Sequence, residues 1–215
     1  MRQDDTRRDS LIEAILPDVP FDGWSRATIA AASRRLGMDE AEASALLPGG
    51  PRDAVAAFSR WADRKMLAAL DEVPLDAMKV RERVATAVRA RLAALEPHRE
   101  AVRRALALLA LPQNMALGAR LLYDTVDAIW YAAGDTATDF NFYTKRGLLA
   151  GVLASTTLYW LDDRSAGAEA TLGFLERRLG DVMRIPRLGA RLREAADKLP
   201  NPFRLARVAR GGTRT

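Results

Sequence analysis

Apolar residues recur at intervals of three and four along nearly the whole chain, and this spacing constrains the fold more than any other feature. Such spacing places apolar side chains on one face of a helix. No window of five or more residues alternates apolar and polar side chains as a half-buried strand would. Alanine, leucine and arginine, which favour helices, dominate the chain. The sequence therefore predicts an all-α protein.

Prolines, glycines and capping residues divide the chain into about nine to ten expected helices. Gly37 and Gly134 stand where a helix C-terminus calls for a residue that adopts positive φ easily. Asp39 stands where a short helix needs a side-chain acceptor at its N-terminus. The other expected helices cover approximately 6–16, 26–36, 51–72, 75–95, 97–111, 113–133, a long segment ending near 162, 166–185 and 202–210.

The composition excludes several kinds of chemistry. The 215 residues include no cysteine, so disulfides and thiolate metal sites are excluded, and imidazole-based catalysis would have to use the one histidine, His98. There is no phosphate-binding glycine loop and no Glu-x-x-His motif of a di-iron bundle. Asp124 and Asp127 share a helix face, but no nucleophile with a plausible base is apparent. We therefore expect no catalytic residue, no metal and no cofactor.

The segment SRATIAAASRRLGMDEAEASALLPGG is similar to a helix-turn-helix module, with an apolar helix, a glycine turn and a short third helix. In DNA-binding modules the third helix enters the major groove and needs cations to contact phosphates. Here that helix carries Asp39, Glu40 and Glu42, and no cation occurs between Arg35 and Arg52. We therefore expect a degenerate module and no binding of nucleic acid.

The stretch GDTATDFNFYTKR places two carboxylates, three aromatic rings and two cations between long apolar helices. Carboxylates suit an ordinary helix start, because the helix dipole favours them there. If the helix begins at Asp139, that residue shares one face with Phe142, Tyr143 and Arg146. Because the planar guanidinium of arginine matches phosphate, this face suits the rim of an anionic or lipid head-group site. The alternative is packing of Phe142 against Arg146 on a solvated face.

Small and aromatic residues flank this stretch. Gly147, Gly151 and Ser155 repeat every four residues, which allows another helix to approach closely or leaves a groove for a slender ligand. The preceding helix contributes Trp130 and Tyr131, which suit either a core or the wall of a ligand site. The candidate ligand-binding residues are Arg146, Tyr143, Trp130, Tyr131, Gly147 and Gly151.

The C-terminal segment concentrates positive charge. Residues 184–215 carry nine cations and two acids, a net charge of +7, whereas residues 1–183 carry −2. After Pro202, apolar and basic side chains fall on opposite arcs of a short expected helix, which is typical of segments that bind anionic membrane surfaces. The alternatives are a frayed basic tail, a docked terminal helix, and a nucleic acid as the polyanion that the tail contacts. The candidate membrane-binding residues are Phe203, Arg204, Leu205, Arg207, Val208 and Arg210.

The sequence AGDTATDFNFYTKRGLLAGVLASTTLYWLDDRS resembles the signature of the ubiquinone-biosynthesis lipid-binding accessory proteins, a family with a TetR-repressor-like helical fold. The similarity is densest from about Asp124 to Leu179 and extends more loosely over the chain. The resemblance implies that fold and a non-enzymatic role. It also implies that isoprenoid quinone intermediates and phospholipid bind in an apolar pocket among the C-terminal helices of a membrane-bound homodimer.

The resemblance further implies that the protein presents its lipid to the di-iron demethoxyubiquinone hydroxylase. The family's head-group arginine falls on Arg146 and its patch tyrosine on Tyr143. Phe142 stands where the family usually has tryptophan. The partner-contact residues implied by the resemblance are Asp139, Phe142 and Tyr143.

These features divide the chain into three expected parts. They are a degenerate helix-turn-helix-like module over 1–72, lipid-binding and dimerisation helices over 73–185, and a basic amphipathic tail over 186–215. Eukaryotic members of the family carry a mitochondrial leader, whereas this chain begins with the acidic segment MRQDDTRRDS. We therefore expect a bacterial protein, cytoplasmic and peripheral to the inner (plasma) membrane. The alternative function is that of a TetR-type ligand-responsive transcriptional regulator.

Overall fold

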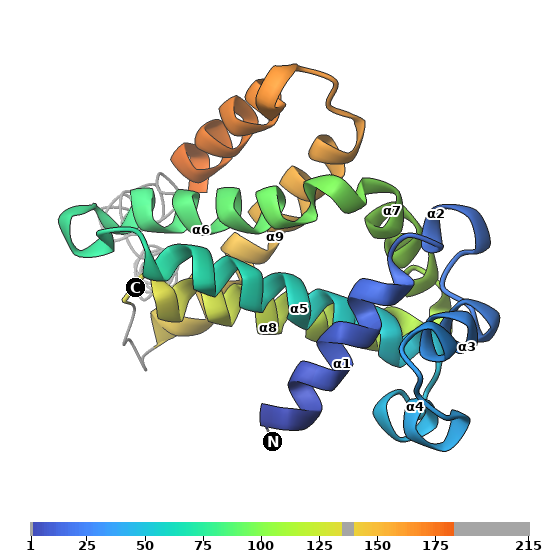
Figure 1. Ribbon diagram of the computed structural model, residues 1–215. Coiled ribbons are helices and arrows are strands. Elements are labelled where there is room, and N and C mark those ends of the chain that lie inside the picture. Colours follow the sequence, from blue (N-terminus) through green and yellow to red (C-terminus); the bar gives the residue numbers. More distant parts are fainter. Residues whose placement is uncertain (1, 135–139, 183–215) are drawn as a thin grey trace, which may run out of the picture.

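The computed structural model describes residues 2–134 and 140–182, with side chains over 4–134 and 144–182. Within these ranges every regular element is helical and no strand occurs, so the prediction of an all-α protein is confirmed (Figure 1). The α-helices are α1 (Arg2–Ile15), α2 (Val19–Asp22), α3 (Arg26–Arg35), α4 (Glu40–Leu46), α5 (Pro51–Asp71), α6 (Val80–Leu95), α7 (Arg99–Leu109), α8 (Met115–Ala132), α9 (Phe140–Asp162) and a further helix over 169–182.

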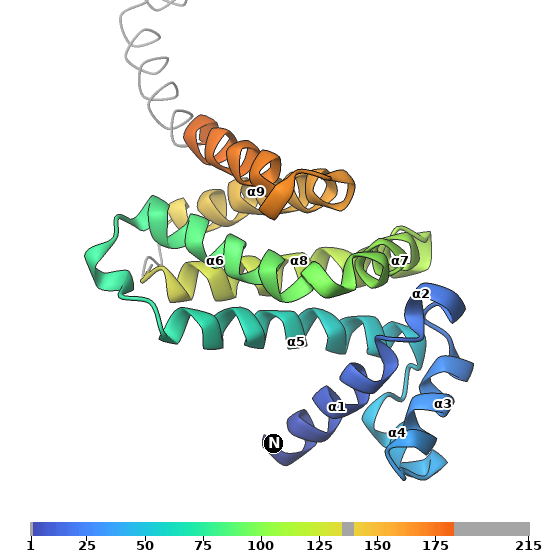
Figure 2. The same cartoon turned by 45° about the horizontal axis from the view of Figure 1, so that its top comes forward.

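The helices form a small N-terminal group and a larger layered group. Helices α1 to α4 gather at the end of α5 where that helix begins (Figure 1). In Figure 2, α5 lies on one side of α6 and α8, while α9 and the helix over 169–182 form a layer on the other side. Helix α8 contacts α5, α6 and α9, so it lies at the centre of the larger group.

Capping residues set the helix boundaries largely as the sequence predicts. The Asp39 side chain accepts a hydrogen bond from the backbone N–H of Glu42 at 2.7 Å, which caps α4. Gly37 and Gly134 adopt φ values of 67° and 81°, each two residues after the last residue of its helix, α3 or α8. The main difference is that α6 begins at Val80, because the preceding residues form a short 3-10 helix.

An aromatic cluster joins the N-terminal group to α5. The rings of Trp24 and Trp61 lie 5.2 Å and 5.8 Å from the ring of Phe58, measured between centroids. His98 stands edge-on to Trp61 at 5.6 Å, so this histidine belongs to a packed cluster. Burial there lowers the pKa of His98, and the nearby carboxylate of Glu13 partly offsets that effect.

Asp163 organises the turn between α9 and the helix over 169–182. Its carboxylate accepts hydrogen bonds from the backbone N–H and hydroxyl of Ser165, at 2.8 Å and 2.6 Å. It accepts two more from the backbone N–H and hydroxyl of Thr171, at 2.8 Å and 2.5 Å. These donors hold the pKa of Asp163 well below its ordinary value, because they stabilise the ionised form.

Length and composition give no single membrane-spanning helix among the described residues. Within the described part of the chain, one pair of helical segments, Val80–Leu109 and Pro112–Ala132, is long and apolar enough when taken together, but it is bent by 100° at the junction. The expected membrane-binding tail lies outside the described residues, and the three expected parts of the chain stay predictions.

Candidate functional site

A cavity of about 510 Å³ lies among α5, α6, α7, α8 and α9. Its wall is predominantly apolar and largely buried, with one or more side chains from each of these five helices. Buried wall residues include Val55, Phe58, Leu95, Val102, Leu121 and Leu153. A volume of this order suits a drug-sized ligand, and an apolar lining with few polar groups is typical of small-molecule sites.

The mouth of the cavity is also apolar. Met115 at the start of α8 is 61% exposed, and Leu158 of α9 is 59% exposed. Both side chains line the cavity, so large hydrophobic groups face water at its opening. Exposed apolar surface beside a cavity is typical of a site that takes an apolar ligand.

A polar network closes part of the cavity wall. The Nε of Arg91 in α6 donates to Oδ1 of Asp63 in α5 at 2.8 Å. An Nη2 proton of Arg91 is donated to the hydroxyl of Ser59 at 3.2 Å. The hydroxyl of Thr125 in α8 lies 3.0 Å from each carboxylate oxygen of Asp63. Arg91, Ser59 and Thr125 line the cavity, and Arg91 and Asp63 are about nine-tenths buried.

The sequence reasoning missed this network, although a signal for it exists. Asp63 lies on a face of α5 that otherwise carries buried apolar residues such as Met66 and Leu70. Arg91 likewise shares its face of α6 with Val88 and other apolar residues. One charge on each of two apolar helix faces indicates a buried pair, because isolated charges are rarely buried.

The structure places Arg146 away from this cavity. Its side chain is buried and its Nε and Nη2 lie 2.8 Å and 2.7 Å from Oδ1 of Asp127. Trp130 lies nearby, with the Nζ of Lys145 5.7 Å from its ring centroid. Neither Arg146 nor Trp130 is among the residues that line the cavity.

The other predicted ligand-binding residues either are exposed or have side chains that the structure does not describe. Tyr131, Gly147 and Gly151 are exposed, and a Cβ added to either glycine would meet nothing within 4 Å. Phe142 and Tyr143 lie in the first turn of α9, but their side chains are outside the described part. Asp139 and the tail residues Phe203, Arg204, Leu205, Arg207, Val208 and Arg210 also lie outside it.

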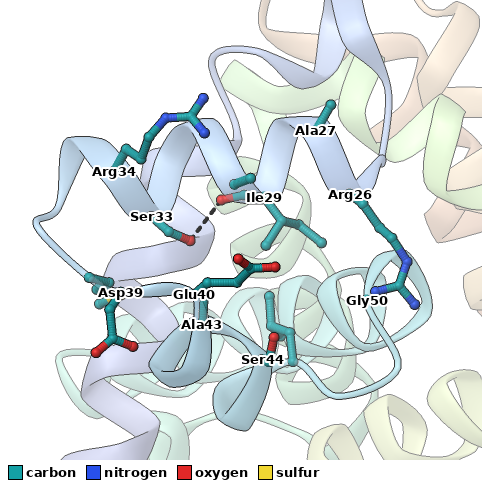
Figure 3. Close-up of a pocket in the computed structure, with 13 residues that line it drawn as sticks. Arg26, Ala27, Ile29, Ser33, Arg34, Asp39, Glu40, Ala43, Ser44 and Gly50 are labelled. Atoms are coloured by element: carbon teal, nitrogen blue, oxygen red, sulfur yellow. Dashed lines mark hydrogen bonds between the residues drawn. The ribbon is translucent and has the colours of Figure 1, made fainter.

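A second cavity, of about 600 Å³, lies between α3 and α4. Figure 3 shows Arg26 and Arg34 on the α3 side and Asp39 and Glu40 on the α4 side. The hydroxyl of Ser33 donates a hydrogen bond to the carbonyl oxygen of Ile29 in the same helix, at 2.8 Å. Because α4 presents carboxylates, this face has the wrong charge for a helix that enters a DNA groove.

Comparison with known proteins identifies relatives of the chain. Residues 115–186 match the model of the COQ9 family. The chain is 33% identical over 196 residues to the mitochondrial ubiquinone biosynthesis protein COQ9 of Rattus norvegicus, covering 88% of this chain and 62% of that protein. The Homo sapiens protein of the same name is 33% identical, with 88% and 61% covered. The chain thus spans about three fifths of the length of these curated relatives.

These names correct the expected location. The relatives from rat, human and Bos taurus are named mitochondrial proteins, which contradicts the expectation of a bacterial protein, cytoplasmic and peripheral to the inner membrane. That expectation was wrong because it rested on the acidic first residues, and such a segment does not identify a compartment.

A solved structure supports the fold. The TetR transcriptional regulator from Nitrosomonas europaea ATCC 19718 is similar with a TM-score of 0.68 and 18% sequence identity, covering 83% of this chain and 98% of that one. At this identity the similarity bears on the fold alone, and it confirms the predicted TetR-like architecture. The family match, the relatives and the fold agree, and they confirm the resemblance of the chain to the COQ9 family.

Proposed function

We propose that this chain is a non-enzymatic lipid-binding protein of ubiquinone biosynthesis. It takes an isoprenoid quinone intermediate from a membrane into the cavity among α5 to α9 and presents it to the di-iron demethoxyubiquinone hydroxylase. The observation that carries the proposal is the apolar cavity of about 510 Å³ with its apolar mouth. Each buried CH₂ group contributes roughly 0.8 kcal/mol, so an apolar cavity is what a hydrocarbon chain needs outside a bilayer.

The names of the relatives support the pathway in this proposal. The rat and human proteins are called ubiquinone biosynthesis proteins. The lipid, the hydroxylase and the membrane are inferences from the family resemblance and from the chemistry of the chain. Phospholipid is a second proposed ligand of the same cavity, with its hydrocarbon chain inside and its charged head group outside.

The proposal assigns no bond-making step to this chain. The polar groups that line the cavity are Ser59, Arg91, Thr125 and Thr157. The hydroxyls of Thr125 and Thr157 donate to Asp63 and to the carbonyl of Leu153. These groups can orient a ligand, but they do not form the nucleophile and base pair of covalent catalysis.

Homodimer formation is part of the proposal, through the outward faces of α8 and α9. Tyr131 is a large exposed side chain on α8. Gly147 and Gly151 have no side chain, and the space next to them on the surface of α9 is open. Small residues at a helix surface allow another helix to approach closely, so this face suits a second copy of the chain.

A pair of substitutions on α7 tests the cavity. Ala105 is buried and lines the cavity, whereas Ala107 is exposed on the same helix and does not line it. We expect Ala105→Phe to fill the cavity and to lower co-purifying lipid about tenfold, while Ala107→Phe leaves it unchanged. Mass spectrometry of the extracted lipid measures both. Equal lipid in the two variants, in folded protein, would exclude this cavity as the site.

A ligand-responsive transcriptional regulator is the rival function, and the TetR-type fold is the observation in its favour. A mobility-shift assay with competitor DNA separates the two functions. We expect no sequence-specific complex, because Asp39 and Glu40 stand where a recognition helix needs cations. A specific complex whose stability falls with salt would favour the regulator.

A further inference from the structure

The cavity has an apolar mouth and, within an interior that is mostly apolar, one buried polar group that centres on Arg91. Met115 and Leu158 stand at the exposed end. Among the described residues that line the cavity, Arg91 is the one with a charged side chain, and it is 9% exposed. A ligand with one polar end and one apolar end therefore meets two different environments.

Arg91 has hydrogen-bonding capacity to spare within the described part of the chain. A guanidinium carries five N–H donors. The hydrogen bonds of Arg91 to described residues use Nε, toward Asp63, and Nη2, toward Ser59. The other N–H donors remain for an acceptor in the cavity that Arg91 lines. A donor that is held in place by two protein partners is preorganised for a ligand oxygen.

The ion pair sets the charge of the group that fits. Asp63 balances the charge of Arg91, and Thr125 hydrogen-bonds both oxygens of that carboxylate. An anionic head group would bring a second negative charge into a low-dielectric site and would compete with Asp63. A neutral carbonyl or hydroxyl oxygen accepts a hydrogen bond from Arg91 without adding charge, so a neutral head group fits better.

We propose that the cavity binds a neutral, oxygen-bearing lipid of the quinone type with its ring inward. A ring oxygen accepts a hydrogen bond from Arg91, and the hydrocarbon tail leaves the cavity between Met115 and Leu158. This inference rests on the lipid-binding function proposed above and adds the orientation and the charge class of the ligand. In this orientation the ring is shielded inside the protein, so the lipid has to slide outward before another protein can act on the ring.

The orientation can be measured because the chain has no cysteine. Ala116→Cys places a nitroxide label beside the mouth, at an exposed residue that does not line the cavity. The probe is decylubiquinone, a benzoquinone with a ten-carbon tail. The label should broaden the NMR signal of the tail methyl more than the signals of the ring methoxy groups. Ala68→Cys, exposed on α5 about three turns beyond Phe58, is the control position.

The outcomes separate the two proposals. Stronger broadening of the methoxy signals from the mouth label would overturn the ring-inward orientation and leave lipid binding intact. No binding of decylubiquinone to the unlabelled chain would overturn the cavity assignment itself. Stronger broadening of the tail methyl signal by the mouth label supports both lipid binding in the cavity and the ring-inward orientation.

A double substitution tests the polar anchor. Arg91→Met with Asp63→Leu removes both charges together, so no buried charge is left alone. We expect the affinity for decylubiquinone to fall about tenfold or more, since a hydrogen bond to a charged donor is lost. The affinity for decylbenzene, which has the ring and tail without oxygen, should change by less than about twofold.

Two results would overturn the anchor role. One is an unchanged affinity for decylubiquinone, and the other is an equal loss for both ligands. In the wild-type chain, decanoate should bind more weakly than decylubiquinone, and stronger binding of the anion would overturn the neutral class. The decanoate and nitroxide measurements leave Arg91 and Asp63 in place, so they decide the proposal even if the double variant does not fold.

Discussion

Arg146 of α9 contacts a single carboxylate oxygen of Asp127 in α8 through two nitrogens, at 2.8 Å and 2.7 Å. The two side chains differ in burial, since that of Arg146 is 6% exposed and that of Asp127 is 49% exposed. The contact joins the central helix to the layer formed by α9. It also gives Arg146 a structural role, whereas the head-group role that the family resemblance implies would need a site other than the cavity, because Arg146 does not line it.

The unequal burial of this pair predicts unequal costs of substitution. Asp127→Ala removes a carboxylate from a buried guanidinium and should lower the free energy of unfolding by about 1–3 kcal/mol. Arg146→Met keeps much of the packing and leaves a carboxylate that water can reach, so its cost should be smaller. Urea unfolding measures both.

The Asp127→Ala, Arg146→Met double variant is the control for coupling. Its loss should be smaller than the sum of the two single losses. Additive losses would contradict an energetically significant pair. Lipid content measured in Arg146→Met addresses the head-group role independently, because that role predicts less bound lipid.

His98 makes stability depend on pH near neutrality. Its pKa in the folded chain is lowered from the ordinary 6.5 by burial. As the pH falls, the unfolded chain therefore binds protons before the folded chain does. The free energy of unfolding is at its full value above about pH 7.5 and decreases as the pH falls through 6.5 toward the pKa of His98 in the folded chain. Unfolding free energies measured between about pH 5.5 and 8 should show this slope.

His98→Phe provides the comparison for that slope. The chain has no other histidine, so this variant should lose most of the pH dependence in that range. A variant with the same slope as the wild-type chain would contradict the assignment to the aromatic cluster.

Asp163 should control how firmly the helix over 169–182 is held. Asp163→Ala removes four hydrogen bonds at the start of that helix and should speed amide hydrogen exchange there, with little change in α5. The neighbouring Asp162→Ala is the matched control, because its side chain is 80% exposed. Equal exchange in the two variants would show that the cap is dispensable.

The charge of the tail predicts reversible membrane binding. Removal of residues 199–215 takes away four arginines and no acid, each cation contributing roughly 1 kcal/mol near an anionic surface. We expect the truncated chain to float less with anionic liposomes than the full chain, with an unchanged unfolding midpoint. Equal flotation would mean that the body alone accounts for membrane binding.

Local signals predicted much of the fold. Asp39, Gly37 and Gly134 were assigned to helix ends, and each occupies that position in the structure. These signals act through the backbone of their own segment, so they can be read from a few neighbouring residues. The family signature near the start of α9 likewise identified the family from one contiguous stretch.

The cavity and its polar network could not be predicted in the same way. Asp63 and Arg91 are 28 residues apart and lie on different helices. Periodicity shows which face of a helix is buried, but it does not show which other helix covers that face. For the same reason, Arg146 could be placed on a helix face while its contact with Asp127 could not be anticipated.

Phe58 belongs both to the wall of the cavity and to the ring stack that contains Trp24 and Trp61. A ligand that reaches Phe58 would contact a ring that packs against two indoles. Quinones quench indole emission, so the tryptophan fluorescence of the chain should decrease when a quinone occupies the cavity. Binding can be titrated by light alone, with no dye attached to the protein.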